Sequence, residues 1–140
     1  MRAVVQRTTE ASVRVAETVV GSIGTGFCVL LAVETGDDLN DARWMAKKVA
    51  RLRIFPDEEG RTNLDLAAVG GAVLMVSQFT LAAECSHGNR PSFVRAADPT
   101  VAIKLIELVI EELRVTHNIP VETGRFAATM EVTLVNDGPF

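Results

Sequence analysis

Apolar and polar residues alternate with a period of two in three parts of the chain. The first alternation begins at Arg2 and is clearest over residues 11–15, the second covers residues 18–23, and the third covers residues 130–135. Because successive side chains of a β-strand point to opposite faces, this period predicts three strands. Residues 27–33 are instead continuously apolar, which predicts a strand covered on both faces.

Two other segments have the spacing of helices. From Asp38 onwards apolar residues recur every three or four positions as far as Leu52, with aspartates at the start and Lys and Arg toward the end. These charges match the helix dipole, so a helix is expected there. The pair Asp98-Pro99 predicts the start of a second helix, an N-cap followed by a first-turn proline. This helix is expected to stop near His117.

The two predicted helices lie between predicted strands, without a repeat or a linker. A turn around residues 56–60 predicts a hairpin-like connection, and residues 72–83 form a further apolar, strand-like run. Residues 1–140 are therefore expected to form a single domain of the mixed α/β class, with an α+β-like arrangement.

The run over residues 72–83 is interrupted by three polar residues, Ser77, Gln78 and Thr80. A buried amide or hydroxyl without a partner costs about 1–3 kcal/mol, so a core strand gains nothing from them. A loop that contains Arg90 and Pro91 follows directly. We therefore expect this stretch to belong to a functional site.

Composition narrows the class of protein. The chain is 48% hydrophobic and 23% charged, with no apolar run near the roughly 20 residues of a membrane span. Its first residues lack the apolar block of a signal peptide, and free thiols at Cys28 and Cys85 suit a reducing compartment, so a cytoplasmic protein is expected. A net charge of −4 argues against a general nucleic-acid coat but allows a local basic site.

Common catalytic constellations are missing from the sequence. There are only two histidines and no glycine-framed serine, so a hydrolase triad has no support. Cys85 and His87 are too few ligands for a zinc site, and no glycine motif has the spacing of a dinucleotide or phosphate loop. We expect no metal and no cofactor. An enzyme built from the remaining residues would stabilise charge with backbone amides.

Six motifs, in this order along nearly the whole chain, resemble those of the D-aminoacyl-tRNA deacylases, which check chirality in translation. The motifs are Gln6-Arg7, Arg53-Ile54-Phe55, Ser77-Gln78-Phe79-Thr80-Leu81, Gly88-Asn89-Arg90-Pro91-Ser92-Phe93, Thr123-Gly124-Arg125-Phe126-Ala127-Ala128 and Asn136-Asp137-Gly138-Pro139.

The resemblance implies a three-layer β/β/α domain with partly rolled mixed or antiparallel sheets and two main helices. It also implies a homodimer that acts on the 3′-terminal adenosine end of aminoacylated tRNA, with the active site at the subunit interface. There residues 77–80 of one chain would meet a cis Gly138-Pro139 pair of the other. The carbonyls of that pair would accept the ammonium of a D-aminoacyl group and clash with an L side chain. Glycyl groups, which have no side chain, are expected to be hydrolysed as well.

The same resemblance assigns roles to single residues. The backbone amides around Ser77, Gln78, Phe79 and Thr80 would form the catalytic oxyanion site, and Thr80 is either a nucleophile or a positioning group. The substrate-binding residues would include Gly138, Pro139 and a bracing Arg7. Phe126 and Met130, like Phe79, either contact the adenosine or pack in the core. Arg90 and Arg125 either bind phosphates or form surface ion pairs.

Members of the resembled family continue beyond the Gly-Pro pair, whereas this sequence ends at Phe140. A shortened final strand is therefore expected, which weakens support for Gly138 and Pro139. The leading interpretation is an esterase that removes D-amino acids from tRNA. Its alternatives are a tRNA 3′-end binding module without turnover, and a structural dimer in which the polar groups of residues 77–80 only satisfy one another.

Overall fold

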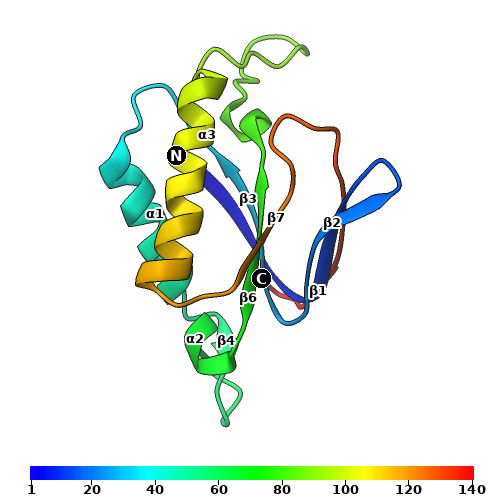
Figure 1. Ribbon diagram of the computed structural model, residues 1–140, viewed down its shortest axis with the longest axis vertical. Helices are drawn as coiled ribbons and strands as arrows, with labels where there is room; N and C mark the ends of the chain where they lie inside the picture. Colours follow the sequence, from blue (N-terminus) through cyan, green and yellow to red (C-terminus); the bar gives the residue numbers. More distant parts are fainter.

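The longest strand of the computed structural model, β1 (Arg2–Val15), belongs to both halves of a strongly curled sheet (Figure 1). The structure describes residues 1–140. The other elements are β2 (Thr18–Ile23), β3 (Gly26–Ala32), α1 (Leu39–Arg51), β4 (Phe55–Pro56), β5 (Thr62–Leu64), α2 (Leu66–Val69), β6 (Ala72–Ser77), the 3-10 helix η1 (Phe79–Ala82), α3 (Pro99–Glu111), the π-helix η2 (Glu112–Thr116), β7 (Val121–Thr123) and β8 (Glu131–Asn136).

Pairing along β1 divides the sheet into two parts. Residues 2–8 pair antiparallel with β3, which continues through parallel β6 and β7. Residues further along β1 pair antiparallel with β2 and with β8. Gly26 opens β3 where a Cβ would lie 1.9 Å from the carbonyl oxygen of Ala72, so only glycine allows β3 and β6 to approach there.

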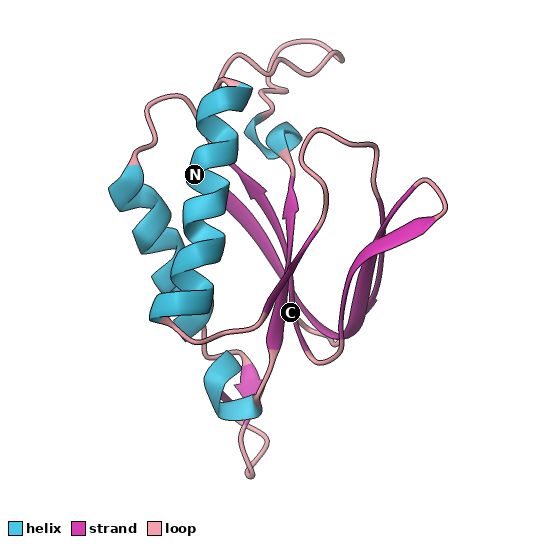
Figure 2. Ribbon diagram, in the orientation of Figure 1, coloured by secondary structure: helices cyan, strands magenta, loops and turns pink.

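Alternate side chains of β3 face two different cores. Phe27, Val29 and Leu31 are fully buried in a cluster shared with α1 and α3, which cover one face of the sheet (Figure 2). Cys28 faces the other way, into a smaller cluster with residues of β1, β2 and β6. Two sheet layers and one helix layer result, so the predicted mixed α/β, three-layer β/β/α class and the doubly covered strand are confirmed.

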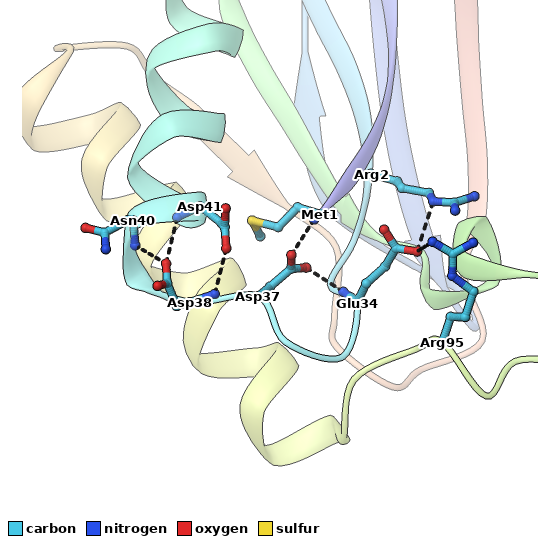
Figure 3. A network of polar contacts seen from close by, with 8 residues as sticks. All are labelled: Met1, Arg2, Glu34, Asp37, Asp38, Asn40, Asp41 and Arg95. Carbon is cyan, nitrogen blue, oxygen red and sulfur yellow. Dashed lines mark hydrogen bonds and ion pairs between the residues drawn. The ribbon is translucent and has the colours of Figure 1, made fainter.

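Both main helices begin where the sequence predicts. The Asp38 side chain accepts hydrogen bonds from the backbone amides of Asn40 (2.7 Å) and Asp41 (3.1 Å), and the Asp41 carboxylate accepts from the Asp38 amide at 2.9 Å (Figure 3). This reciprocal capping box starts α1. The Asp98 side chain caps α3 by accepting a hydrogen bond from the Thr100 backbone amide at 2.8 Å, without a reciprocal bond.

The prediction of one strand-like run over residues 72–83 is wrong. β6 ends at Ser77, and residues 79–82 form the 3-10 helix η1. The Gln78 amide makes the last sheet bond, to the Leu31 carbonyl at 2.8 Å, after which the backbone turns. β7 was not predicted, because three residues are too few to show a period. No helix has the length and apolar character that crossing a membrane requires. Cys28 and Cys85 are free thiols, as predicted.

Candidate functional site

A cavity of about 750 Å³ opens where the parallel strands β3 and β6 end. We call it the β3/β6 pocket. Its walls are formed by three segments, which are named next, and by helix α3. From η1 and the end of β6 come Ser77, Gln78 and Phe79; from the loop before α3, Phe93, Ala96 and Ala97; from the β7–β8 loop, Phe126, Ala127, Ala128 and Met130. Five of the predicted site residues therefore lie in one cavity.

Two backbone amides beside this pocket have no acceptor within the chain. A 3-10 helix leaves its first amides unpaired. The Gln78 amide donates to Leu31 and the Leu81 amide to Gln78, whereas the amides of Phe79 and Thr80, which lie between them, make no intramolecular hydrogen bond. Two successive free N–H groups at the rim of a cavity suit an oxygen atom that gains negative charge.

The polar side chains of this segment contact each other. The Gln78 side-chain amide donates to the hydroxyl oxygen of Thr80, and Ser77 lies half-buried in the pocket wall. Because an amide N–H cannot take up a proton, Gln78 does not supply the base that a nucleophilic Thr80 would need. Further along the chain, the Glu84 carboxylate accepts a hydrogen bond from the backbone amide of Ser86. This bond lowers the pKa of the Glu84 carboxyl group, so Glu84 is a weak base.

The apolar lining is aromatic at its mouth. The Phe79 and Phe93 rings meet edge to face with centroids 5.2 Å apart, and 58% of Phe79 is exposed. Phe126 and Met130 are half-buried: each packs against one of the two cores and also lines the pocket. Core packing and ligand contact are therefore compatible roles for these two residues.

Arg7 on β1 contacts the Gly138-Pro139 segment, at the end of the sheet away from the β3/β6 pocket. Its guanidinium donates to the carbonyl oxygens of Asp137 (3.1 Å) and Gly138 (2.9 Å), and to that of Ile54. Its Nε also lies 2.8 Å from the Asp137 carboxylate. Arg7 is only 6% exposed, and the Gly138-Pro139 peptide bond is cis. These contacts fix the Gly138-Pro139 segment on β1 within one chain, and the bracing of an active site by Arg7 stays a prediction.

The two halves of the predicted site lie apart in a single chain. Arg7 pairs with Phe27 at the start of β3, whereas Ser77 pairs with Leu31 near the end of that strand. The C-terminal segment lies on β1, where the Phe140 carbonyl oxygen accepts the Arg7 backbone amide at 3.3 Å, whereas η1 follows the upper end of β6 (Figure 1). One chain therefore presents the β3/β6 pocket and the Gly138-Pro139 loop as separate surfaces.

Arg90 and Arg125 lie in loops next to the pocket segments but do not line the cavity. Both are exposed, and neither forms an ion pair within the chain. Their guanidinium groups are accordingly available to an external anion. No three histidine, cysteine or acidic side chains come together in a way that would hold a metal ion.

Several residues of these clusters were not singled out from the sequence. The Asp137 carboxylate and the Ile54 carbonyl complete the contacts of Arg7, although both lie within motifs that carry the family resemblance. A second group, Arg2, Glu34 and Arg95, forms one charge cluster and had no sequence signal, because its members are far apart in the chain.

Comparisons with known proteins agree with this architecture. Residues 4–140 match the family model described as D-Tyr-tRNA(Tyr) deacylase. A D-aminoacyl-tRNA deacylase of Chloroflexus aurantiacus is 54% identical over 139 residues, which are 99% of this chain and 86% of the relative.

Two solved structures have the same fold. A c-Myc DNA unwinding element binding protein superposes with a TM-score of 0.91 at 38% identity and covers 100% of this chain and 95% of its own. A probable eukaryotic D-amino acid tRNA deacylase has a TM-score of 0.86 at 15% identity, over 98% and 94% of the two chains, and shows the fold alone. On the family model and the identity to its relatives, this chain belongs to the D-Tyr-tRNA(Tyr) deacylase family of hydrolases.

Proposed function

We propose that this protein hydrolyses the ester bond between a D-amino acid and the terminal ribose of tRNA. The observation that carries the proposal is the pair of unpaired amides, of Phe79 and Thr80, in the segment whose residue Phe79 lines a 750 Å³ cavity. Family membership supplies the substrate class, because the relatives are named D-aminoacyl-tRNA deacylases. As an enzyme of translation quality control, it would act in the cytoplasm.

In the proposed reaction, the oxygen of a water molecule adds to the ester carbonyl carbon. The carbonyl oxygen becomes an oxyanion, which the two amides stabilise as it forms. The bond from the carbon to the ribose oxygen then breaks, and that oxygen leaves with a proton. The products are a free D-amino acid and deacylated tRNA. The ribose 2′-hydroxyl assists the attack, since the group that contacts the Thr80 hydroxyl is the Gln78 side-chain amide, which is not a base.

Discrimination between D and L esters would need a second copy of the chain. Because the Gly138-Pro139 loop and the β3/β6 pocket are separate surfaces of one chain, a homodimer would bring the loop of one copy to the pocket of the other. Val135 on β8 and the terminal Phe140 are 47% and 37% exposed, which supports burial against another chain. A rigid Gly138 carbonyl can then accept the ammonium of a D-aminoacyl group and obstruct an L side chain.

The remaining predicted residues would hold the end of the tRNA. The exposed Phe79 ring would stack on the terminal adenine, a contact worth about 1–3 kcal/mol per base. Arg90 and Arg125 would neutralise phosphates of the last nucleotides. None of these contacts reaches the amino-acid side chain, so we expect several D-amino acids, and glycine, to be removed.

Hydrolysis of matched D-aminoacyl-, L-aminoacyl- and glycyl-tRNA by the 140-residue chain, without added metal, tests the proposal. The D and glycyl esters should be lost rapidly and the L ester spared. Binding of all three esters without hydrolysis of any would contradict the proposal and favour a tRNA-binding module. A folded dimer that neither binds nor hydrolyses them would favour a structural role.

A further inference from the structure

Glu34 lies two residues after the end of β3, between two walls of the β3/β6 pocket. Its carboxylate oxygen Oε1 is 3.1 Å from Nε of Arg2 and 3.1 Å from Nη2 of Arg95 (Figure 3). The Glu34 side chain is 17% exposed, and this oxygen atom is inaccessible to solvent. Because the two contacts lack hydrogen-bond alignment, charge attraction is what holds the three side chains together.

Each arginine continues to a different wall. Arg2 also donates from Nη1 to the carbonyl oxygen of Leu81 at 3.3 Å, and Leu81 lies in η1, the segment that carries the free amides of Phe79 and Thr80. Arg95 lies in the loop before α3, whose neighbours Ala96 and Ala97 line the pocket.

Backbone contacts tie the second wall to the same place. The Thr35 amide donates to the Arg95 carbonyl at 2.9 Å, and the Ala97 amide donates to the Val33 carbonyl at 3.0 Å. Glu34 and Ala96 form an isolated antiparallel bridge. The Glu34 amide in turn donates to the Asp37 carboxylate at 2.6 Å, which fixes the start of the loop toward α1. The carboxylate of Glu34 therefore sits where three segments converge.

We propose that Glu34 is a positioning residue that sets the distance between the two walls of the pocket. Through Arg2 it fixes η1 and its two amides, and through Arg95 it fixes the wall formed by residues 93–97. It touches neither the ester nor the tRNA. The expected effect of Glu34 on catalysis rests on the proposed function, whereas its expected effect on the two pocket walls does not.

The test replaces Glu34 by glutamine, which keeps the size of the side chain and removes its charge. Glu112→Gln is the matched control, because Glu112 is similarly buried (21% exposed) and pairs with Arg43, on the helix layer between α1 and η2. Hydrogen exchange of wild type and both variants is measured first. Glu34→Gln should speed exchange at the amides of residues 81–83 and 96–97, and Glu112→Gln should not. Equal exchange in those amides would overturn the proposal, whether or not the chain is an esterase.

Steady-state hydrolysis of a D-aminoacyl-tRNA is measured on the same samples. Misplaced oxyanion donors act only in the transition state, so Glu34→Gln should lower kcat about tenfold with a smaller change in KM. Arg2→Gln should reproduce the loss in kcat, and the Arg2→Gln, Glu34→Gln double variant should be no slower than either single variant. A rate that falls only in proportion to the folded fraction, or additive losses in the double variant, would contradict a positioning role. Inactive wild type would instead refute the proposed function and leave the exchange result to decide on Glu34.

Discussion

The Arg7 guanidinium donates to the carbonyl oxygen of Gly138 at 2.9 Å, across 131 positions of sequence. The same side chain holds Asp137 and the carbonyl of Ile54, and its carbon Cζ lies 5.2 Å from the centre of the Phe140 ring. A planar, forked cation can satisfy several acceptors at once, which a lysine cannot. Arg7 therefore gives the C-terminal Gly138-Pro139 segment a fixed place on β1.

Arg7→Lys should weaken both the fold and the reaction. Lysine cannot donate to all of these partly buried carbonyl oxygens, so the free energy of unfolding should fall by about 1 kcal/mol. The value of kcat/KM for a D ester should fall about tenfold or more, because the displaced loop no longer meets the ammonium. Denaturant unfolding and hydrolysis rates check this. Arg14→Lys, an exposed arginine on the same strand, is the control. Equal effects of the two changes would refute the bracing role.

Thr80→Ser and Thr80→Ala separate a nucleophile from a positioning group. In the structure the Thr80 hydroxyl oxygen accepts a hydrogen bond from the side-chain amide of Gln78. A positioning role predicts that alanine keeps a measurable fraction of the rate, since the backbone amide of residue 80 remains. No acyl-enzyme should accumulate in rapid-quench measurements. Nearly complete loss in alanine, with full activity in serine, would establish covalent catalysis instead.

Gln78→Ala should affect hydrolysis more than folding. The Gln78 side chain is half-buried and donates its hydrogen bond to the exposed Thr80, so removing this side chain should cost little stability. It does orient the segment that carries the two free amides, and we expect kcat to fall about tenfold. Thermal unfolding and kinetics on one preparation give both values. A loss of about 1 kcal/mol or more in stability with unchanged hydrolysis would favour the structural alternative.

Local features of the fold were predictable from the sequence, whereas long-range ones were not. The caps at Asp38 and Asp98 depend on residues within one turn, so a short window contains their signal. The end of β6 depends on the Leu31 carbonyl, which lies 47 positions from Gln78, and no local pattern marks it. For the same reason the residue pattern pointed only to the polar side chains of Ser77, Gln78 and Thr80. The resemblance implied backbone amides in this segment, but which of them are free became visible only with the 3-10 turn.

The residues around the site divide along the same line. Gly138, Pro139 and residues 77–80 were found because they form compact motifs. Glu34 was not, because its partners Arg2 and Arg95 lie 32 and 61 positions away, and a single acidic residue after a strand has no distinctive pattern. Charge clusters between segments require the tertiary structure.

The two cysteines should react at very different rates. Burial raises the pKa of the Cys28 thiol, whereas Cys85 is exposed. A thiol reagent at pH 8 should therefore modify one cysteine rapidly in the native protein and two after denaturation, and Cys85→Ser should leave no rapid reaction. Because the pKa of Cys28 is higher in the folded than in the unfolded protein, the folded state keeps this proton to higher pH. The free energy of unfolding should therefore decrease as pH rises above about 9. Rapid native labelling of both thiols would contradict the buried position.

The most direct measurement asks whether one active site uses two chains. Gln78→Ala should weaken the pocket half about tenfold, and Pro139→Ala should damage the loop half. In each pure variant every site contains one damaged half. If the site is shared, random mixing gives dimers in which one of the two sites has both halves intact, so about a quarter of the wild-type sites should return. The mixture should then hydrolyse D-aminoacyl-tRNA and spare the L ester. No gain over the separate variants, once subunit exchange has been verified, would contradict a site shared between two chains.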